Sequence, residues 1–137
     1  MAATYIDEAL ILHALTLSAI TSIVNQRVYH IEAQQDAKKP YVVLNLVAPS
    51  DDSEDFLHTD HGQPLFQWTC VSDRTKTPCD AFLVAHAIKA AFRNLSGSVQ
   101  GITIRYIWTT GPREIPGVGK EGEVVCIVES EVHYVGL

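Results

Sequence analysis

The chain has 137 residues, of which 47% are apolar and 19% are charged, and its formal net charge is −6. This composition predicts a single globular domain over residues 1–137 and excludes an intrinsically disordered chain. The acidic balance argues against sequence-independent binding to nucleic-acid phosphates. No apolar run approaches the roughly 20 residues that cross a bilayer. Asp7 and Glu8 stand where a signal peptide would be basic, so we expect a protein that stays in the cytoplasm where it is made.

The first predicted element is a helix over Tyr5–Leu17, which Thr4 can cap. Apolar side chains recur along one face of this helix, at Ile6, Leu10, Ala14 and Leu17. Ser18–Val24 predicts a short second helical turn, and Arg27–Ile31 predicts a brief strand.

A strand is predicted over Pro40–Ala48, and because both of its faces are largely apolar we expect both to be covered. The next segment, Pro49–Gln63, is a long irregular loop of a length that is usually functional. It lacks lysine and arginine and carries five carboxylates, at Asp51, Asp52, Glu54, Asp55 and Asp60. A solvated loop is the ordinary interpretation, but inside a ring through which DNA moves such charges would repel the phosphate backbone.

Leu65–Val71 predicts a strand because its residues alternate between two faces. One face carries Phe66, Trp68 and Cys70. A helix is predicted over Pro78–Leu95, with Thr77 as its N-cap and Gly97 as a left-handed stop. Its apolar stripe consists of Ala81, Val84, Ala85, Ile88, Ala91 and Leu95.

Two strands close the chain, the first over Ile102–Thr109 and the second over Val124–Tyr134. In the first, one face is expected to carry Ile102, Ile104, Tyr106 and Trp108. Residues 111–122, rich in glycine and proline, predict a long hairpin loop between them. The fold class is therefore α+β: a mainly antiparallel sheet of four to five strands with two main amphipathic helices on one face.

The sequence offers weak candidates for chemistry. The cluster at 58–61, His-Thr-Asp-His, could supply three zinc ligands, but it lacks a fourth partner and a rigid frame. Gly117-Val118-Gly119-Lys120 fails the phosphate-loop pattern, which needs an earlier glycine and a following Ser or Thr. Glu129 and Glu131 share one strand face and favour a charged surface over a catalytic pair. We expect no catalytic residue, no cofactor and no metal.

Three stretches resemble the small tail-completion, or tail-terminator, proteins of long-tailed bacteriophages and prophages. The first runs from Ile23 to Tyr29 and on through Ala33-Gln34-Gln35 to the strand that begins at Lys39-Pro40-Tyr41. The second is Phe66-Gln67-Trp68-Thr69-Cys70 with the alanine-rich helix after it. The third is the closing Glu131-Val132-His133-Tyr134. Together they span most of the chain, although each motif is structural and degenerate.

The resemblance implies a non-enzymatic virion protein at the neck end of the tail. It would form a ring, commonly six-fold, that caps the tail tube, stops its polymerisation and presents a docking surface to the head connector. DNA would pass through without specific binding. We expect the contacts with itself, the tube protein and the connector to lie in exposed loops and edges. The candidate residues are Arg27, Tyr29, Asp51, Asp52, Glu54, Asp55, Phe56, His58, Asp60, His61, Arg113, Glu114, Lys120 and Glu121.

Two other classes of function stay open at this point. One is a head–tail adaptor that binds as a monomer between other rings. The other is a small enzyme whose site is built from residues scattered along the chain. Self-association into a closed ring would favour the terminator, whereas a large cleft with shifted pKa values would favour the enzyme.

Overall fold

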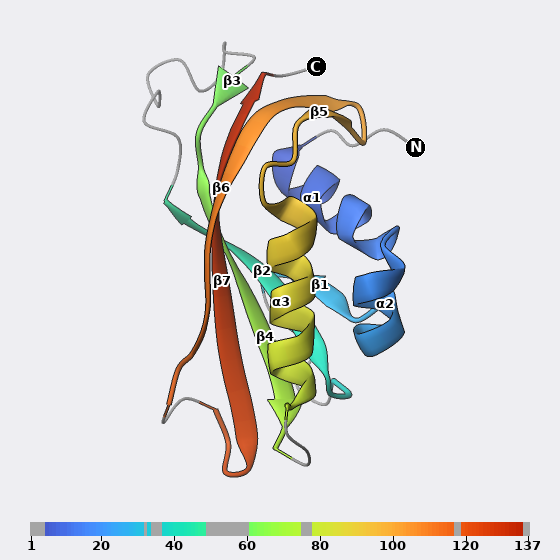
Figure 1. The fold of residues 1–137 in the computed structure, drawn as a ribbon, viewed down its shortest axis with the longest axis vertical. Helices are drawn as coiled ribbons and strands as arrows, with labels where there is room; N and C mark the ends of the chain where they lie inside the picture. The colour runs from blue at the N-terminus through green and yellow to red at the C-terminus, as the bar shows by residue number, and fades with distance from the viewer. Residues whose placement is uncertain are drawn as a thin grey trace.

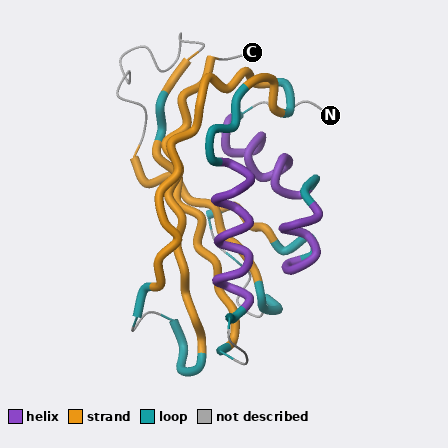
Figure 2. The backbone as a smooth tube through the Cα atoms, viewed as in Figure 1, coloured by secondary structure: helices purple, strands orange, loops and turns teal. Residues whose placement is uncertain are grey.

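The computed structural model describes residues 5–31, 33, 37–48, 61–74, 78–116 and 119–135, with His61 and Gly62 described by their backbone alone. Three helices lie on one side of a long sheet, and no described helix covers its other side (Figure 1). Figure 2 shows the same division along the backbone, with helices on one side and strands on the other. The predicted caps Thr4 and Thr77 lie outside the described residues.

The sheet contains seven strands in the described part of the chain, and six follow one another in the order β1-β2-β4-β7-β6-β5. The short β3 also pairs with β7. The pair β1–β2 is parallel, and the other pairs are antiparallel. The strands are β1 (Val28–His30), β2 (Tyr41–Ala48), β3 (His61–Gly62), β4 (Leu65–Asp73), β5 (Gly97–Val99), β6 (Ile102–Glu114) and β7 (Glu123–Val135). The predicted α+β class is therefore right, but the sheet is larger than the expected four to five strands.

The helices are α1 (Ile6–Leu15), α2 (Ser18–Val24) and α3 (Asp80–Phe92). The expected second helical turn is thus a separate helix of seven residues, and three helices rather than two cover the sheet. No single described helix is long and apolar enough to span a membrane, and the α1–α2 pair, which together passes that test, is bent by 81°.

The core lies between α3 and the middle of the sheet. Two cross-strand rows face the helices: Val42, Cys70 and Cys126 form one, and Leu44, Trp68 and Val128 form the other. All six side chains are fully buried. The ring of Trp68 lies 5.0 Å from that of Phe92 on α3, centroid to centroid. These contacts confirm the predicted inward face of β4, which carries Phe66, Trp68 and Cys70. The expectation that both faces of β2 are covered is wrong, because the described helices lie on one side of the sheet only.

Helix α3 begins two residues later and ends three residues earlier than predicted. Cys79 occupies the N-cap position without a side-chain cap bond, and the buried Ser72 hydroxyl of β4 instead accepts the Ala81 N–H at 3.0 Å. At the other end Asn94 takes the left-handed conformation, with φ of 62°. Gly97, predicted as the stop, also has a positive φ but begins β5.

The expected alternation along β6 is wrong beyond Ile104. The strand register shifts between Ile104 and Tyr106, so Arg105 is an extra residue in a bulge. Ile107 therefore turns into the core, where it is 2% exposed, and Tyr106 and Trp108 turn outward. The strand also continues to Glu114, which shortens the predicted 111–122 loop to residues 115–122.

Candidate interaction surface

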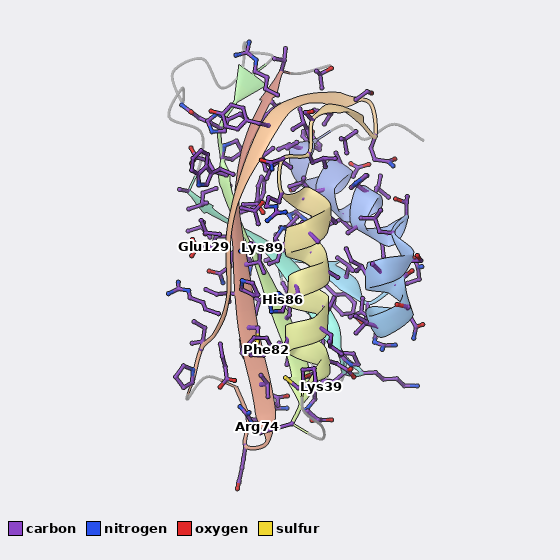
Figure 3. All side chains as sticks on the ribbon, viewed as in Figure 1. Lys39, Arg74, Phe82, His86, Lys89 and Glu129 are labelled. Atoms are coloured by element: carbon purple, nitrogen blue, oxygen red, sulfur yellow. The ribbon has the colours of Figure 1, made fainter. Side chains whose placement is uncertain are left out.

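The face of the sheet opposite the helices combines an apolar centre with polar surroundings; we call it the uncovered face. Register places Val43, Thr69, Ile127 and Arg113 in one row across four strands. The next row consists of Asn45, Gln67, Glu129 and Thr110. Val43 and Ile127 are buried at the centre, so the face offers mainly polar groups to a partner. Glu129 points away from the helices here, whereas Phe82, His86 and Lys89 lie along α3 (Figure 3).

Glu129 and Glu131 each have a separate side-chain partner on the uncovered face. Arg113 Nη2 lies 3.3 Å from the Glu129 carboxylate, and His133 Nε2 lies 3.2 Å from that of Glu131. The His133 ring stacks on Tyr106 with 4.1 Å between centroids. Each carboxylate thus has its own partner, an arrangement that differs from two carboxylates sharing one proton.

One lysine ties together the lower end of the sheet, where β2 begins, β4 ends and β7 begins. Lys39 Nζ lies 2.6 Å from Glu123 and 3.0 Å from Asp73. The hydrogen bond from Lys39, followed by that from the Lys120 backbone N–H, lowers the pKa of Glu123. The same two carboxylates raise the pKa of Lys39. These ion pairs border a 530 Å³ groove lined by Tyr41, Val43 and Thr69, among others.

Two further grooves lie at the two edge regions of the sheet. The first, of 280 Å³, lies between α1 and the end of β1; we call it the acidic groove because Asp7 and Glu8 line it. The second, of 470 Å³, lies between the end of α3 and β6; we call it the arginine groove because Arg93 lines it. Trp108, which lines the second groove, is 67% exposed.

The predicted contact residues near β1 have different roles. Arg27 is structural: its Nε donates to the Pro40 carbonyl at 2.8 Å, and its own carbonyl accepts the Val42 N–H at 3.0 Å. Tyr29 lies on the uncovered face, where its ring meets Tyr41 edge to face at 6.0 Å. The sequence therefore placed Tyr29 on a usable surface, whereas Arg27 holds the β1–β2 connection in place.

The predicted contact residues near the β6–β7 hairpin are not brought together with β1. Arg113 pairs with Glu129, and Glu114 accepts from Arg74 at 3.1 Å. Lys120 and Glu121 are exposed at the turn. His61 lies in β3, opposite Val135 of β7. The candidates outside the described residues are Asp51, Asp52, Glu54, Asp55, Phe56, His58 and Asp60.

Sequence reasoning missed the two most exposed aromatic side chains of the sheet, Trp108 and Tyr106 (45% exposed). It assigned them to the same half-buried face as Ile104. A signal was present, because Ile102, Ile104 and Ile107 cannot all share one face of a regular strand. The switch from even to odd positions between Ile104 and Ile107 indicates a bulge. With a bulge there, Tyr106 and Trp108 face outward.

No family model and no curated protein matches the sequence. A solved structure does match the fold: a chain from the virion of a native gene transfer agent (GTA) particle superposes with a TM-score of 0.67. The alignment covers 92% of both chains at 15% sequence identity. A second solved chain, 17% identical, superposes with a TM-score of 0.48 over 89% of this chain and 93% of its own length. The protein thus has the α+β fold of a chain found in a phage-like virion particle.

Proposed function

We propose that the protein is a structural component of a phage or phage-like virion, located at the neck end of the tail. There it forms a ring, six-fold by likeness to tail terminators, that caps the tail tube and stops its polymerisation. The head connector then docks on this ring, and DNA passes through it. The protein binds and positions other proteins and catalyses no reaction.

The observation that carries this proposal is the fold match to a chain of the gene transfer agent virion over 92% of both lengths. The surfaces support it independently. The uncovered face offers mainly polar groups, and the exposed aromatic side chains of β6 suit protein contacts, where such residues are enriched. The paired carboxylates Glu129 and Glu131 fit such a surface better than a catalytic site.

The test is deletion of the gene in cells that produce the particle, followed by electron microscopy. We expect heads without attached tails together with tail tubes of uncontrolled length. Complementation with the intact chain, carried on a plasmid, should restore joined particles of uniform tail length. Normal particles after deletion would contradict the proposal. Tails of normal length that fail to join heads would favour the monomeric adaptor instead.

A further inference from the structure

The two edge grooves have opposite charge, and each contains a charged side chain that has no ion-pair partner among the described residues. In the acidic groove, Asp7 is already used, because its carboxylate lies 2.8 Å from His30 Nε2 and accepts the Glu8 N–H at 2.8 Å. The neighbouring Glu8 carboxylate forms no ion pair with any described residue. Among the described residues, Glu8 is therefore the unpaired negative charge of this groove.

The arginine groove carries the matching positive charge. Arg93, at the end of α3, has no carboxylate partner within the described part of the chain. Each groove also presents an exposed aromatic ring: Trp108 here, and Tyr5, 69% exposed, in the acidic groove. Aromatic and arginine side chains are the commonest energetic centres of protein interfaces.

The backbone of β6 is open beside the arginine groove. Strand β5 pairs with Ile102–Ile104 alone, so on that side no described strand accompanies the rest of β6. The Ile107 carbonyl points away from β7, because it accepts the Asn94 N–H at 3.4 Å. By the alternation of an antiparallel ladder, the polar backbone groups of Thr109 point the same way. An unpaired edge of this kind is a template for contact with another chain.

We propose that the arginine groove of one copy docks on the acidic groove of the next copy, with Arg93 facing Glu8 and Trp108 facing Tyr5. Charge selects the occupant: two arginine grooves repel each other, as do two acidic grooves, whereas unlike grooves attract. The two grooves are different surfaces, so the contact is head to tail, the type that generates a closed ring when its rotation closes. This contact rests on the proposed ring and names the surfaces that would build it.

The test exchanges the two charges in separate variants, Arg93→Glu and Glu8→Arg. Each variant alone presents two grooves of like charge, so light scattering behind a sizing column should give a monomer of 15.1 kDa. An equimolar mixture restores both unlike pairs and should regain the wild-type mass. A matched charge reversal at an exposed position that lines neither groove, Lys38→Glu, should leave assembly unchanged.

A neutral variant guards against misfolding of the charge reversals. Trp108→Ser removes an exposed ring from the surface, so the monomer should keep its circular dichroism. The concentration at half-assembly should rise at least tenfold. In the wild type, assembly should shift the tryptophan emission to shorter wavelength as Trp108 leaves water. Trp68 is already fully buried and should contribute no shift.

Three outcomes would overturn the contact. If the charge variants assemble like the wild type, the ring is built by surfaces other than the two grooves. A mixture that stays monomeric would show that the two grooves do not meet. A wild type that stays at 15.1 kDa up to millimolar concentration would also exclude this contact. In each case the proposed virion function is tested separately by the gene deletion, whose result does not depend on self-association in solution.

Discussion

Ser72 supports the first turn of α3 although it belongs to strand β4. Its hydroxyl is buried and accepts the Ala81 N–H at 3.0 Å, in place of a cap from the helix itself. The variant Ser72→Ala should lower the free energy of unfolding by about 1–2 kcal/mol, because a buried N–H then loses its acceptor. Urea unfolding followed by circular dichroism measures this loss. Ser98→Ala, exposed on β5, is the matched control and should change stability by less than about 0.5 kcal/mol; equal losses would contradict the assignment.

The sequence predicts some residues well and others not at all, for a physical reason. The inward positions of Phe66, Trp68 and Cys70 follow from a period of two, which depends on the strand alone. The cap from Ser72 depends on β4 and α3 meeting in space, so spacing along the chain does not reveal it. The same holds for the ion pair of Arg113 with Glu129, which joins residues of two strands.

At the scale of elements, β6 has a second register shift, between Thr110 and Arg113, and this segment contains a glycine. Gly111 has a φ of 105°, and a Cβ added there would lie 3.0 Å from the Ile127 carbonyl oxygen. Gly97 has a φ of 97° with nothing within 4 Å of the added Cβ. Both Gly→Ala variants strain the backbone, by about 1 kcal/mol or more.

Gly111→Ala should lower the free energy of unfolding further, by about 1–3 kcal/mol beyond Gly97→Ala, since it also meets backbone that cannot give way. Thermal unfolding of both variants beside the wild type measures the difference. Equal losses for the two glycines would show that the neighbouring strand β7 moves to make room for the added Cβ.

Long elements with a strong period were predicted close to their observed bounds. Strand β2 was expected over Pro40–Ala48 and runs over Tyr41–Ala48. The apolar stripe likewise identified helix α3, although the observed helix begins two residues later than predicted. The short strands β3 and β5 were missed because two or three residues carry no period, and their pairing is decided by β7 and β6. The bulge at Arg105 broke the alternation on which the prediction for β6 depended.

At the scale of the whole molecule, the ion pairs of Lys39 with Asp73 and Glu123 link the start of β2, the end of β4 and the start of β7. The pKa of Glu123 lies below 4.5 in the folded protein. Its contribution to stability is therefore present at neutral pH and is lost as the pH falls through 4.5 towards that lowered pKa. Lys39→Met should destabilise the protein at pH 7, and the difference from the wild type should shrink as the pH approaches 3.

Urea midpoints at pH 7, 5 and 3 measure that convergence. Lys38→Met, which removes an exposed charge one residue away, should run parallel to the wild type at all three values. A Lys39→Met deficit that stays constant from pH 7 to pH 3 would mean that packing of the lysine stem, and not its charge, supports this end of the sheet.

The candidate surface was harder to predict than the fold. Exposed loops were reasonable choices from sequence, and Tyr29 does lie on the uncovered face. The two edge grooves, however, combine residues far apart along the chain, such as Glu8 with His30 and Arg93 with Trp108. Nothing in a linear pattern joins these pairs. Their proximity follows from the order of strands in the sheet and from the helix that ends beside its edge.

The buried thiols of the central strands allow opening of the core to be measured by chemical labelling. Cys70 and Cys126 face each other in register as free thiols. Burial raises the pKa of Cys70 and raises that of Cys126 to about 11. At neutral pH only on the order of one Cys126 thiol in ten thousand is ionised and able to attack a disulfide reagent. Both side chains face the helices, so labelling must wait until the helices separate from the sheet. The rate of modification at Cys70 and Cys126 therefore measures how often the core opens.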